Sequence, residues 1–243
     1  MRIPRIFTPQ ALTEGQQIDL DDAAANHVGR VLRMEKGRPL FVFNGESECH
    51  YSAIIDHSDK KRVSITLKEK HDSQLESPIS IHVAQAISKG DKMEWVIQKC
   101  VELGATEITP IWSEHCDVKL NHERFEKKLQ QWKGIIISAC EQCGRDRVPR
   151  LNPVVRISDW VSSIESDVKW VLDPRGNPAK QQADIRPTSA AIAIGPEGGL
   201  SADEIELCKQ HGFGAKLIGP RVLRTETAAL TAITLLQAQW GDF

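Results

Sequence analysis

The sequence contains no uninterrupted apolar run that approaches the roughly 18 residues of a membrane-spanning helix. Its opening, MRIPRIFTPQ, also lacks the charged and then apolar order of a signal peptide. A large net charge is missing as well. The formal net charge of −2 argues against a protein that holds nucleic acid by bulk charge, although it leaves room for a local basic surface.

Several catalytic motifs are also absent. The chain has no GxSxG nucleophile motif, no HExxH zinc motif and no DxDxDG calcium loop, and its eight histidines form no visible pairing. The stretch GPEGG at residues 195–199 lacks the Gly-Lys-Ser/Thr ending of a phosphate-binding loop, and it does not fit GxGxxG. Chemistry on nucleoside triphosphates is therefore disfavoured.

The cysteines do not form the pattern of a disulfide framework. They stand at positions 49, 100, 116, 140, 143 and 208, several of them on apolar helix faces, which favours a reducing cytoplasm. Cys140-x-x-Cys143 needs a second ligand pair to bind zinc, and the nearest candidates are His115 and Cys116. A redox CxxC stands before a helix, whereas this one ends a predicted helix. We therefore expect neither a metal site nor a redox site, and we expect a cytoplasmic protein.

A polar stretch without periodicity, HDSQLESP at residues 71–78, divides the chain into two predicted domains, residues 1–72 and 73–243. The first domain combines short strands with one helix over residues 21–33, which is typical of a small barrel or sandwich. Its predicted strands are Pro39–Asn44, Cys49–Ile55 and Arg62–Leu67, the last with Val63, Ile65 and Leu67 pointing inward.

In the second domain, buried strand patterns alternate with amphipathic helices. Such units with short connections predict an α/β fold with a mostly parallel sheet and helices on both faces. The predicted strands cover residues 79–87, 107–112, 169–173, 191–194 and 215–218, and helices are predicted over 93–101, from about Asn121, after Ser201 and up to Trp240.

The stretch from Ala191 to Ala228 contains two strands that each end in a Gly-Pro turn, GPEGG and GPRVLR. Ser201 and Glu204 after the first turn have the spacing of a capping box, which opens a helix. Two such turns at the carboxyl ends of strands predict a pocket of nucleotide size. A glycine turn without cationic side chains suits an adenosine ligand with little negative charge, which indicates S-adenosylmethionine. The alternative, that the glycines only form tight turns, stays open here.

Basic residues are crowded near the N-terminus: Arg2, Arg5, Arg30, Arg33, Lys36 and Arg38. Arg30 and Arg33 are spaced to share one face of the predicted helix. One interpretation is a solvated helix face, which is the usual role of such charges. The other is a surface that contacts RNA phosphates.

Several stretches together resemble one family. IGPEGGLS, LIGPRVLRTETAALTA, MRIPRIF, HVGRVLRM, KGDKMEWVIQKCVELG and ACEQCGR are similar to the RsmE family of bacterial 16S ribosomal RNA uracil-N3 methyltransferases, within the SPOUT class. The resemblance covers essentially the whole chain. It implies a Rossmann-like SPOUT domain with a deep trefoil knot, a PUA-like β-barrel that binds RNA, and a homodimer. It also implies that S-adenosylmethionine donates a methyl group to N3 of a uridine in the 16S rRNA of the 30S ribosomal subunit.

The resemblance further implies roles for individual residues. The cofactor would be held by Leu172, Asp173, Pro174, Ile194, Gly195, Pro196, Glu197, Gly198, Gly199, Leu217, Ile218, Gly219, Val222, Leu223 and Arg224. Arg224 is the leading candidate for stabilising charge on a uracil carbonyl, and Glu197 and Glu226 are candidate bases. RNA contacts would come from Arg2, Arg5, Arg30, Arg33, Lys89, Lys92 and Arg145.

Two other classes of function stay open from the sequence. One is a non-catalytic RNA-binding or ribosome-assembly protein with an adenosine-ligand pocket. The other is an α/β enzyme that uses a different adenosine cofactor.

Overall fold

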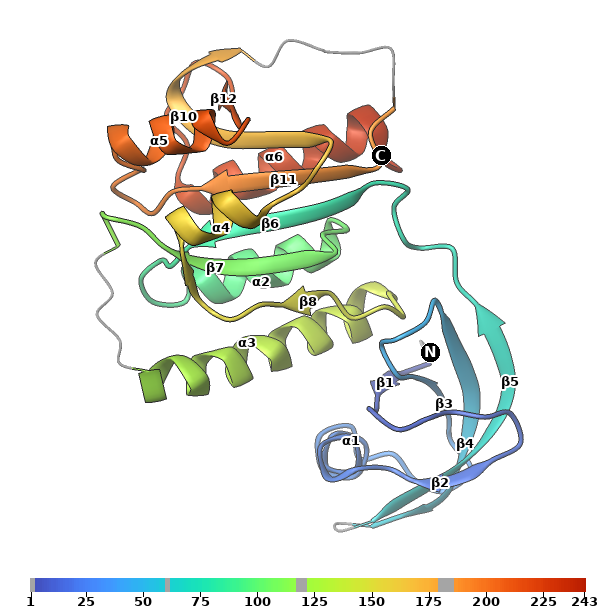
Figure 1. Cartoon of the computed structure of the whole chain (residues 1–243). Helices are drawn as coiled ribbons and strands as arrows, with labels where there is room; N and C mark the ends of the chain where they lie inside the picture. Colours follow the sequence, from blue (N-terminus) through green and yellow to red (C-terminus); the bar gives the residue numbers. More distant parts are fainter. Residues whose placement is uncertain (1–2, 60–61, 117–121, 179–185) are drawn as a thin grey trace. The chain divides into compact units, whose positions relative to one another are not determined.

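The computed structural model describes residues 3–59, 62–116, 122–178 and 186–243 (Figure 1). The chain divides into two compact units, Met1–Glu76 with Ile137–Val148, and Ser77–Ile136 with Pro149–Phe243. The linear division expected after residue 72 does not include the second segment of the first unit. This segment begins inside helix α3 (His122–Cys143), so no break in the amphipathic pattern marks it.

The first unit is built on a five-stranded sheet with the order β1-β3-β4-β5-β2. Its strands are β1 (Arg5–Phe7), β2 (Gln17–Asp19), β3 (Pro39–Phe43), β4 (Cys49–Ser58) and β5 (Val63–Asp72). The three predicted strands correspond to β3, β4 and β5, and β5 runs on into the stretch predicted as a linker. The sequence does not predict β1 and β2, because three residues are too few to show an alternating pattern.

The helix of the first unit is shorter than predicted. α1 (Asp22–Asn26) begins after Asp21, whose carboxylate accepts two backbone hydrogen bonds at 3.0 and 3.3 Å. It continues as one π-helical turn, η1 (His27–Val31). Arg33 lies beyond this turn in the left-handed region, with φ of +51°. The prediction that Arg30 and Arg33 share a helix face is therefore wrong, because the chain leaves the helical conformation between them.

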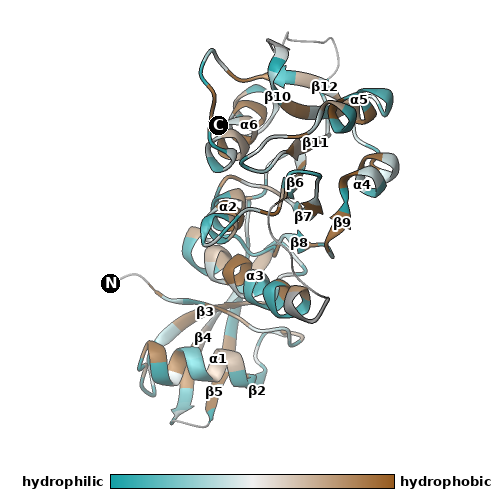
Figure 2. Cartoon of the chain, turned by 90° about the vertical axis from the view of Figure 1, so that its left-hand side faces the viewer, coloured by the Kyte–Doolittle hydropathy of each residue, from teal (hydrophilic) through white to brown (hydrophobic). Residues whose placement is uncertain are grey.

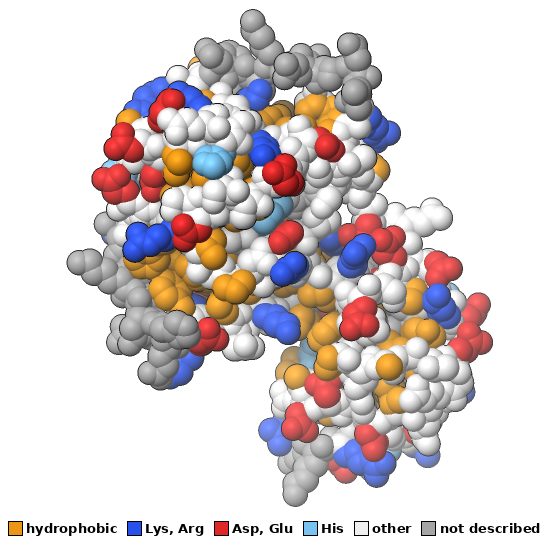
Figure 3. Space-filling view, in the orientation of Figure 1, with side chains coloured by type: hydrophobic (Ala, Val, Ile, Leu, Met, Phe, Trp, Pro, Cys, Tyr) orange, Lys and Arg blue, Asp and Glu red, His pale blue; other side chains and the backbone are white. Residues whose placement is uncertain are grey.

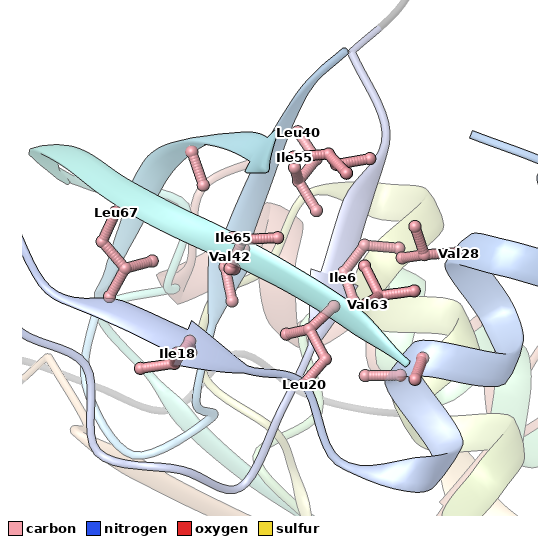
Figure 4. Close-up of a cluster of buried hydrophobic side chains, with 13 residues drawn as sticks. Ile6, Ile18, Leu20, Val28, Leu40, Val42, Ile55, Val63, Ile65 and Leu67 are labelled. Atoms are coloured by element: carbon pink, nitrogen blue, oxygen red, sulfur yellow. The ribbon is translucent and has the colours of Figure 1, made fainter. Parts of the chain in front are cut away.

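The apolar core of the first unit lies between the sheet and α1–η1 (Figure 4). Val63, Ile65 and Leu67 alternate along β5 and are fully buried, as their period of two predicts. Val28 of η1 packs into the same core from the helical side. The core thus joins every strand of the sheet to the helix that carries Arg30.

Residues Ile137–Val148 are fixed to the rest of the first unit by ion pairs. The Asp146 carboxylate is fully buried, accepts a hydrogen bond from Arg5 and lies 2.8 Å from His50 Nδ1. Arg145 is also buried, and its Nε donates to Glu76 Oε1 at 2.9 Å. Losing one partner would leave an uncompensated buried charge, so these pairs hold the segment in place.

The second unit is built on a sheet in which each pair of the described strands is parallel. Its order is β12-β10-β11-β6-β7-β8, with β9 beside β7. The strands are β6 (Ser80–Ala86), β7 (Glu107–Trp112), β8 (Arg150–Leu151), β9 (Val155–Arg156), β10 (Val168–Pro178), β11 (Ser189–Ile194) and β12 (Gly214–Leu217). The helices, besides α3, are α2 (Lys92–Glu102), α4 (Ile157–Ser163), α5 (Ala202–Gln210) and α6 (Thr225–Trp240).

Helices lie on both faces of this sheet. α4 and α5 cover one face, and α2 and α6 lie together on the other (Figures 1 and 2). The predicted α/β fold with a parallel sheet is therefore confirmed. The sequence does not predict β8, β9 and α4, which are too short for a clear period. No helix in the described part of the chain is both long and apolar enough to cross a lipid bilayer.

His27 gives the first unit a pH dependence. Its Nδ1 lies 3.5 Å from Glu141 Oε2. A hydrogen bond to the Glu141 carboxylate raises the pKa of His27 above its ordinary value of 6.5. Because the pKa is raised on folding, the protonated imidazole stabilises the fold fully below pH 6.5, and this contribution is lost as the pH rises through the folded-state pKa.

We expect His27→Gln to lower the thermal unfolding midpoint below about pH 6.5 and to lose this effect at higher pH, where wild-type His27 is also neutral. Thermal unfolding of both proteins across this pH range measures the difference. Glu141→Gln should reproduce the pH-dependent loss, whereas His57→Gln, at a side chain that is 54% exposed, should not. A midpoint difference that does not change with pH would contradict the assignment.

Candidate functional site

A cavity of about 840 Å³ opens at the carboxyl ends of β10, β11 and β12. Most of its wall comes from three segments that follow or interrupt these strands, within residues 172–175, 194–202 and 216–228. Lys92 at the start of α2 and His115 after β7 complete the wall. The volume falls within the range of about 300–1,000 Å³ that is usual for small-ligand pockets.

The first segment is a bulge in β10. Leu172 and Asn177 both pair with Lys216 of β12, so the residues between them are extra on one strand. Inside the bulge, the buried carboxylate of Asp173 accepts hydrogen bonds from the backbone N and the Nε of Arg175, at 3.0 and 3.1 Å. The predicted end of the strand at Asp173 is therefore wrong, because the strand resumes its pairing beyond the bulge.

The second segment is the GPEGG turn after β11. Gly199 N donates to Pro196 O at 2.9 Å, and the φ of Gly199 is +73°, which only glycine adopts readily. A Cβ on Gly195 would lie 2.8 Å from Leu200 N, so the turn has no room for a side chain there. His115 Nδ1 lies 3.0 Å from Gly199 O and contacts the turn from the end of β7. The backbone of this turn is thus held close to the cavity.

Two helices begin at the cavity wall. α5 starts with the predicted capping box, in which Ser201 Oγ accepts from Glu204 N at 3.3 Å and Glu204 Oε2 accepts from Ser201 N at 2.9 Å. α6 starts after Arg224, whose backbone oxygen accepts from Ala228 N at 2.8 Å. Glu226 lies in the first turn of α6. Arg224 and Glu226 are therefore placed at the wall by the start of one helix.

The cavity carries charges of both signs. Its cationic residues are Lys92, Arg175, Lys216, Arg221 and Arg224, and its acidic residues are Asp173, Glu197 and Glu226. The GPEGG turn has no cation of its own, but other segments bring cations to the same cavity. The expectation drawn from the GPEGG turn does not include these cations, two of which are paired with acidic residues of the wall, Lys92 with Glu197 and Arg175 with Asp173. The wall can also receive an anionic group such as a carboxylate.

The two candidate bases differ in their surroundings. Glu197 Oε1 accepts a hydrogen bond from Lys92 Nζ at 2.9 Å. Burial by itself raises the pKa of Glu197, but the hydrogen bonds from Lys92 and the backbone outweigh it, so the pKa falls below its ordinary value of 4.5. Glu226 Oε2 is buried and has no hydrogen-bond partner among the described residues. A carboxylate with a lowered pKa is a weak base, so the surroundings of Glu197 do not favour it as a proton acceptor.

The residues expected to bind the cofactor lie on this wall, with the exception of Gly219, which turns the backbone with φ of +68° but does not line the cavity. The wall also contains residues that the sequence does not assign to the pocket, chiefly His115, Arg175, Lys216 and Thr225. His115 enters the sequence interpretation only as a metal ligand, and Lys216 only as part of an apolar run. Motif analysis does not find His115 and Lys216, because neither belongs to the GPEGG motif or lies next to it in the sequence.

The residues expected to contact RNA have different surroundings. Arg5 and Arg145 are engaged by buried or half-buried carboxylates inside the first unit, so they are not presented to a ligand as expected. Arg30, Arg33 and Lys89 are exposed, and Arg2 lies outside the described residues. Positive and negative side chains are interspersed on the face shown in Figure 3, in keeping with the net charge of −2.

Cys140 and Cys143 lie in the last turn of α3. Burial raises the pKa of the Cys140 thiol to about 12, which disfavours the thiolate that metal binding and disulfide exchange require. Within residues 3–59, 62–116, 122–178 and 186–243, no group of three or more His, Cys, Asp or Glu side chains is arranged to hold a metal ion.

A parallel sheet with glycine turns and a charged cavity at its carboxyl edge defines a ligand-binding α/β domain of the nucleotide-binding kind. Residues 75–237 match the family model described as an RNA methyltransferase domain. The chain is 38% identical to ribosomal RNA small subunit methyltransferase E of Buchnera aphidicola subsp. Schizaphis graminum, over 99% of this chain and 98% of that protein. It is 31% identical to the protein of the same name from Bacillus subtilis, over 96% and 94%. The chain is therefore a methyltransferase, and it belongs to the ribosomal RNA small subunit methyltransferase E family.

Solved structures agree with this membership. A ribosomal RNA small subunit methyltransferase E from Neisseria gonorrhoeae, bound to S-adenosyl methionine, is 36% identical with a TM-score of 0.90, over 100% of both chains. A Legionella pneumophila protein with the bound cofactor SAM is 44% identical with a TM-score of 0.96, again over 100% of both chains. The family expected from the sequence motifs is therefore confirmed.

Gly195 and Gly134 provide a matched pair of substitutions. We expect Gly195→Ala to lower the free energy of unfolding by about 1–3 kcal/mol, because its Cβ would meet backbone atoms of the turn. Gly134→Ala should raise it by up to about 1 kcal/mol, because alanine is the better helix former and the exposed position in α3 has open space. Chemical denaturation of the two variants measures both changes. Equal effects would show that the GPEGG turn tolerates a side chain.

Proposed function

We propose that this protein transfers the methyl group of S-adenosylmethionine to N3 of a uridine in the 16S rRNA of the small ribosomal subunit. The observation that carries the proposal is the cavity at the carboxyl ends of β10, β11 and β12, in a chain whose relatives are solved with this cofactor bound. The residues of the wall that we propose to bind the cofactor belong to 172–174, 194–199, 217–218 and 222–224.

The cavity suits this cofactor in shape and chemistry. Backbone of the GPEGG turn can approach the adenosine closely, because Gly199 carries no side chain and Gly195 lets the turn close on itself. The cations on the wall can receive the carboxylate of the methionine part. The sulfonium already makes the methyl group electrophilic, so the protein has to position the two reactants and exclude water.

The proposed reaction requires a proton to leave uracil N3, since this nitrogen is a weak acid. Glu226 is the proposed acceptor, because its Oε2 is buried at the cavity wall without a hydrogen-bond partner among the described residues. Arg224, two residues before it, is proposed to stabilise the negative charge that develops on a uracil carbonyl. Glu197, held ionised by Lys92, is proposed to orient the turn rather than to take the proton.

We further propose that the last part of the second unit forms a deep trefoil knot of the SPOUT kind. β12 lies at the edge of the sheet beyond β10, whereas α6, which follows it, packs against α2 and beside β11 and β6. The chain must return across the carboxyl ends of β10 and β11 to make this connection. A knot accounts for this return, although most chains avoid one.

The first unit is proposed to be a PUA-like barrel that binds the RNA, and the second to carry out the transfer. The barrel proposal is supported by one apolar core to which all five strands of the sheet and α1–η1 contribute. Arg30, Arg33 and Lys89 are the proposed RNA contacts. A homodimer and a cytoplasmic location belong to the same proposal, because they follow from the family resemblance and from a ribosomal substrate.

Binding of S-adenosylmethionine by calorimetry, followed by transfer of its labelled methyl group to undermethylated 30S subunits, tests the proposed function. If S-adenosylmethionine does not bind, the proposed methyl transfer is excluded. Binding without transfer to any RNA would favour a non-catalytic RNA-binding protein. Mapping of the labelled nucleoside then decides whether the methyl group is on N3 of uridine.

We expect Glu226→Gln to lower kcat by about 10²–10⁴-fold, as loss of a general base does, and Arg224→Ala to lower it by about 10²–10³-fold. Glu197→Gln should have a smaller effect on kcat, because the side chain retains its size at the turn. Methyl transfer to 30S subunits at saturating cofactor gives these rates. If Glu197→Gln proves the more harmful of the two carboxylate changes, Glu226 is not the base.

The pair Arg30→Ala and Arg33→Ala should weaken RNA binding while leaving the affinity for S-adenosylmethionine unchanged. Two lost phosphate contacts to single-stranded RNA should reduce the slope of log K against log salt by about 1.4. Binding isotherms at several salt concentrations measure the slope. Arg62→Ala, an exposed arginine held by Asp19 in the same unit, is the matched control. An equal loss of RNA and cofactor binding would indicate a folding defect instead.

A further inference from the structure

A chain of buried hydrogen bonds connects three segments behind the cavity wall. Gln85, near the end of β6, is fully buried, and its Nε2 donates to Thr225 Oγ1 at 2.9 Å and to Ala86 O at 3.0 Å. Thr225, the first residue of α6, is 7% exposed, and its Oγ1 donates to Gly195 O at 2.6 Å. We call Gln85, Thr225 and Gly195 the relay.

The direction of each hydrogen bond in the relay is fixed by chemistry. The carbonyl oxygens of Gly195 and Ala86 can only accept, so the Thr225 hydroxyl must donate to Gly195. The hydroxyl then has to accept from the Gln85 amide, which uses both of its N–H groups as donors. Neither a carboxylate nor an apolar side chain at position 85 can replace these two donors, and a methyl group at the position of Thr225 Oγ1 breaks both of its bonds.

The amide of Gln85 stands where an apolar side chain is expected. Ile81 and Val83, which precede it on the same face of β6, are fully buried, as is usual for a strand covered on both sides. Gln85 Oε1 is buried without a hydrogen-bond partner among the described residues, which costs free energy. A buried polar group that is only partly satisfied needs a reason other than packing.

We propose that Gln85 and Thr225 are positioning residues of the methyl transfer, a role that rests on the proposed function. Through Gly195 O they fix the GPEGG turn, against which the cofactor lies. Through the backbone of Thr225 they fix Arg224 and Glu226, its neighbours on either side. The relay therefore sets the distance between the methyl donor and the groups that act on the uracil.

The accuracy of this distance matters for the rate. Displacing a reactant by about 1 Å can slow an enzyme by about 100-fold without abolishing binding. The two sides of the relay come from different segments, the turn after β11 and the start of α6, which are 30 residues apart along the chain. Thr225 hydrogen-bonds directly to Gly195, and Gln85 of β6 hydrogen-bonds to Thr225. Both segments are therefore held in position relative to the same strand of the sheet.

The test compares substitutions of similar size that remove a polar group of the relay with one substitution that keeps the Thr225 hydroxyl. We expect Thr225→Val and Gln85→Met to lower kcat for methyl transfer to 30S subunits by about 10- to 100-fold, with KM for the subunits unchanged. Thr225→Ser keeps the hydroxyl and should retain kcat within about twofold of wild type. The double variant should be no slower than the slower single variant, because either change breaks the same relay.

A second buried threonine is the control for loss of stability. Thr109 on β7 is 1% exposed, and its Oγ1 lies 2.7 Å from both His82 Nε2 and Asn152 Nδ2. Thr109→Val should lower the unfolding midpoint about as much as Thr225→Val but leave kcat intact. If Thr225→Val does not yield folded protein, Gln85→Met and Thr225→Ser carry the same comparison.

Three outcomes would overturn the proposal. One is a kcat for Gln85→Met and Thr225→Val within about twofold of wild type. Another is an equal loss for Thr225→Ser and Thr225→Val, and the third is an equal loss of kcat in Thr109→Val. If the wild-type protein transfers no methyl group, both the proposed function and the role of the relay are wrong. If the wild-type protein is active but the relay variants are equally active, only the role of the relay is wrong.

Discussion

The whole site depends on the parallel direction of the strands in the second unit. Because β10, β11 and β12 run the same way, the bulge of β10 and the segments after β11 and β12 all lie at one edge of the sheet. Glycine turns, charged side chains and two helix starts are thereby collected within a single cavity. An antiparallel strand among these three would send its segment to the opposite edge and remove it from the wall.

Some segments of the cavity wall contribute mainly backbone, and others contribute side chains. The GPEGG turn offers mainly backbone, since its glycines leave room for a ligand to approach. The bulge of β10, the end of β12 and the start of α2 bring the cations, and the start of α6 brings Arg224 and Glu226. The two carboxylates of the cavity differ in their partners: Lys92 and backbone hydrogen bonds lower the pKa of Glu197, whereas Glu226 Oε2 is buried without a hydrogen-bond partner among the described residues.

Whether a feature of the fold or the site could be predicted from the sequence depends on how far apart along the chain the interacting residues lie. The sequence predicts strands such as β6, β7 and β11 and the start of α5, because each is marked by a pattern of neighbouring residues. The glycine turns are equally local, because close backbone approach leaves a signature of glycines. The motifs also carry enough of the family pattern to identify the family.

The parts that the sequence does not predict depend on contacts between distant residues. The pair of Arg5 with Asp146 joins positions 141 residues apart, and no local pattern marks it. For the same reason, the return of Ile137–Val148 to the first unit could not be expected. His115 and Lys216 reach the cavity through strand order alone, and Arg33 leaves its helix through a backbone angle that its residue type rarely adopts.

The bulge in β10 has a consequence for how this region can vary. Lys216 of β12 is paired on both sides of the bulge, with Leu172 and with Asn177, so the residues between those two positions take no part in the pairing. Side chains within the bulge can change while the pairing stays intact. A residue gained or lost there would enlarge or shrink the bulge without changing the strand pairing on either side of it. This stretch of the wall can therefore vary both in its chemistry and in its length.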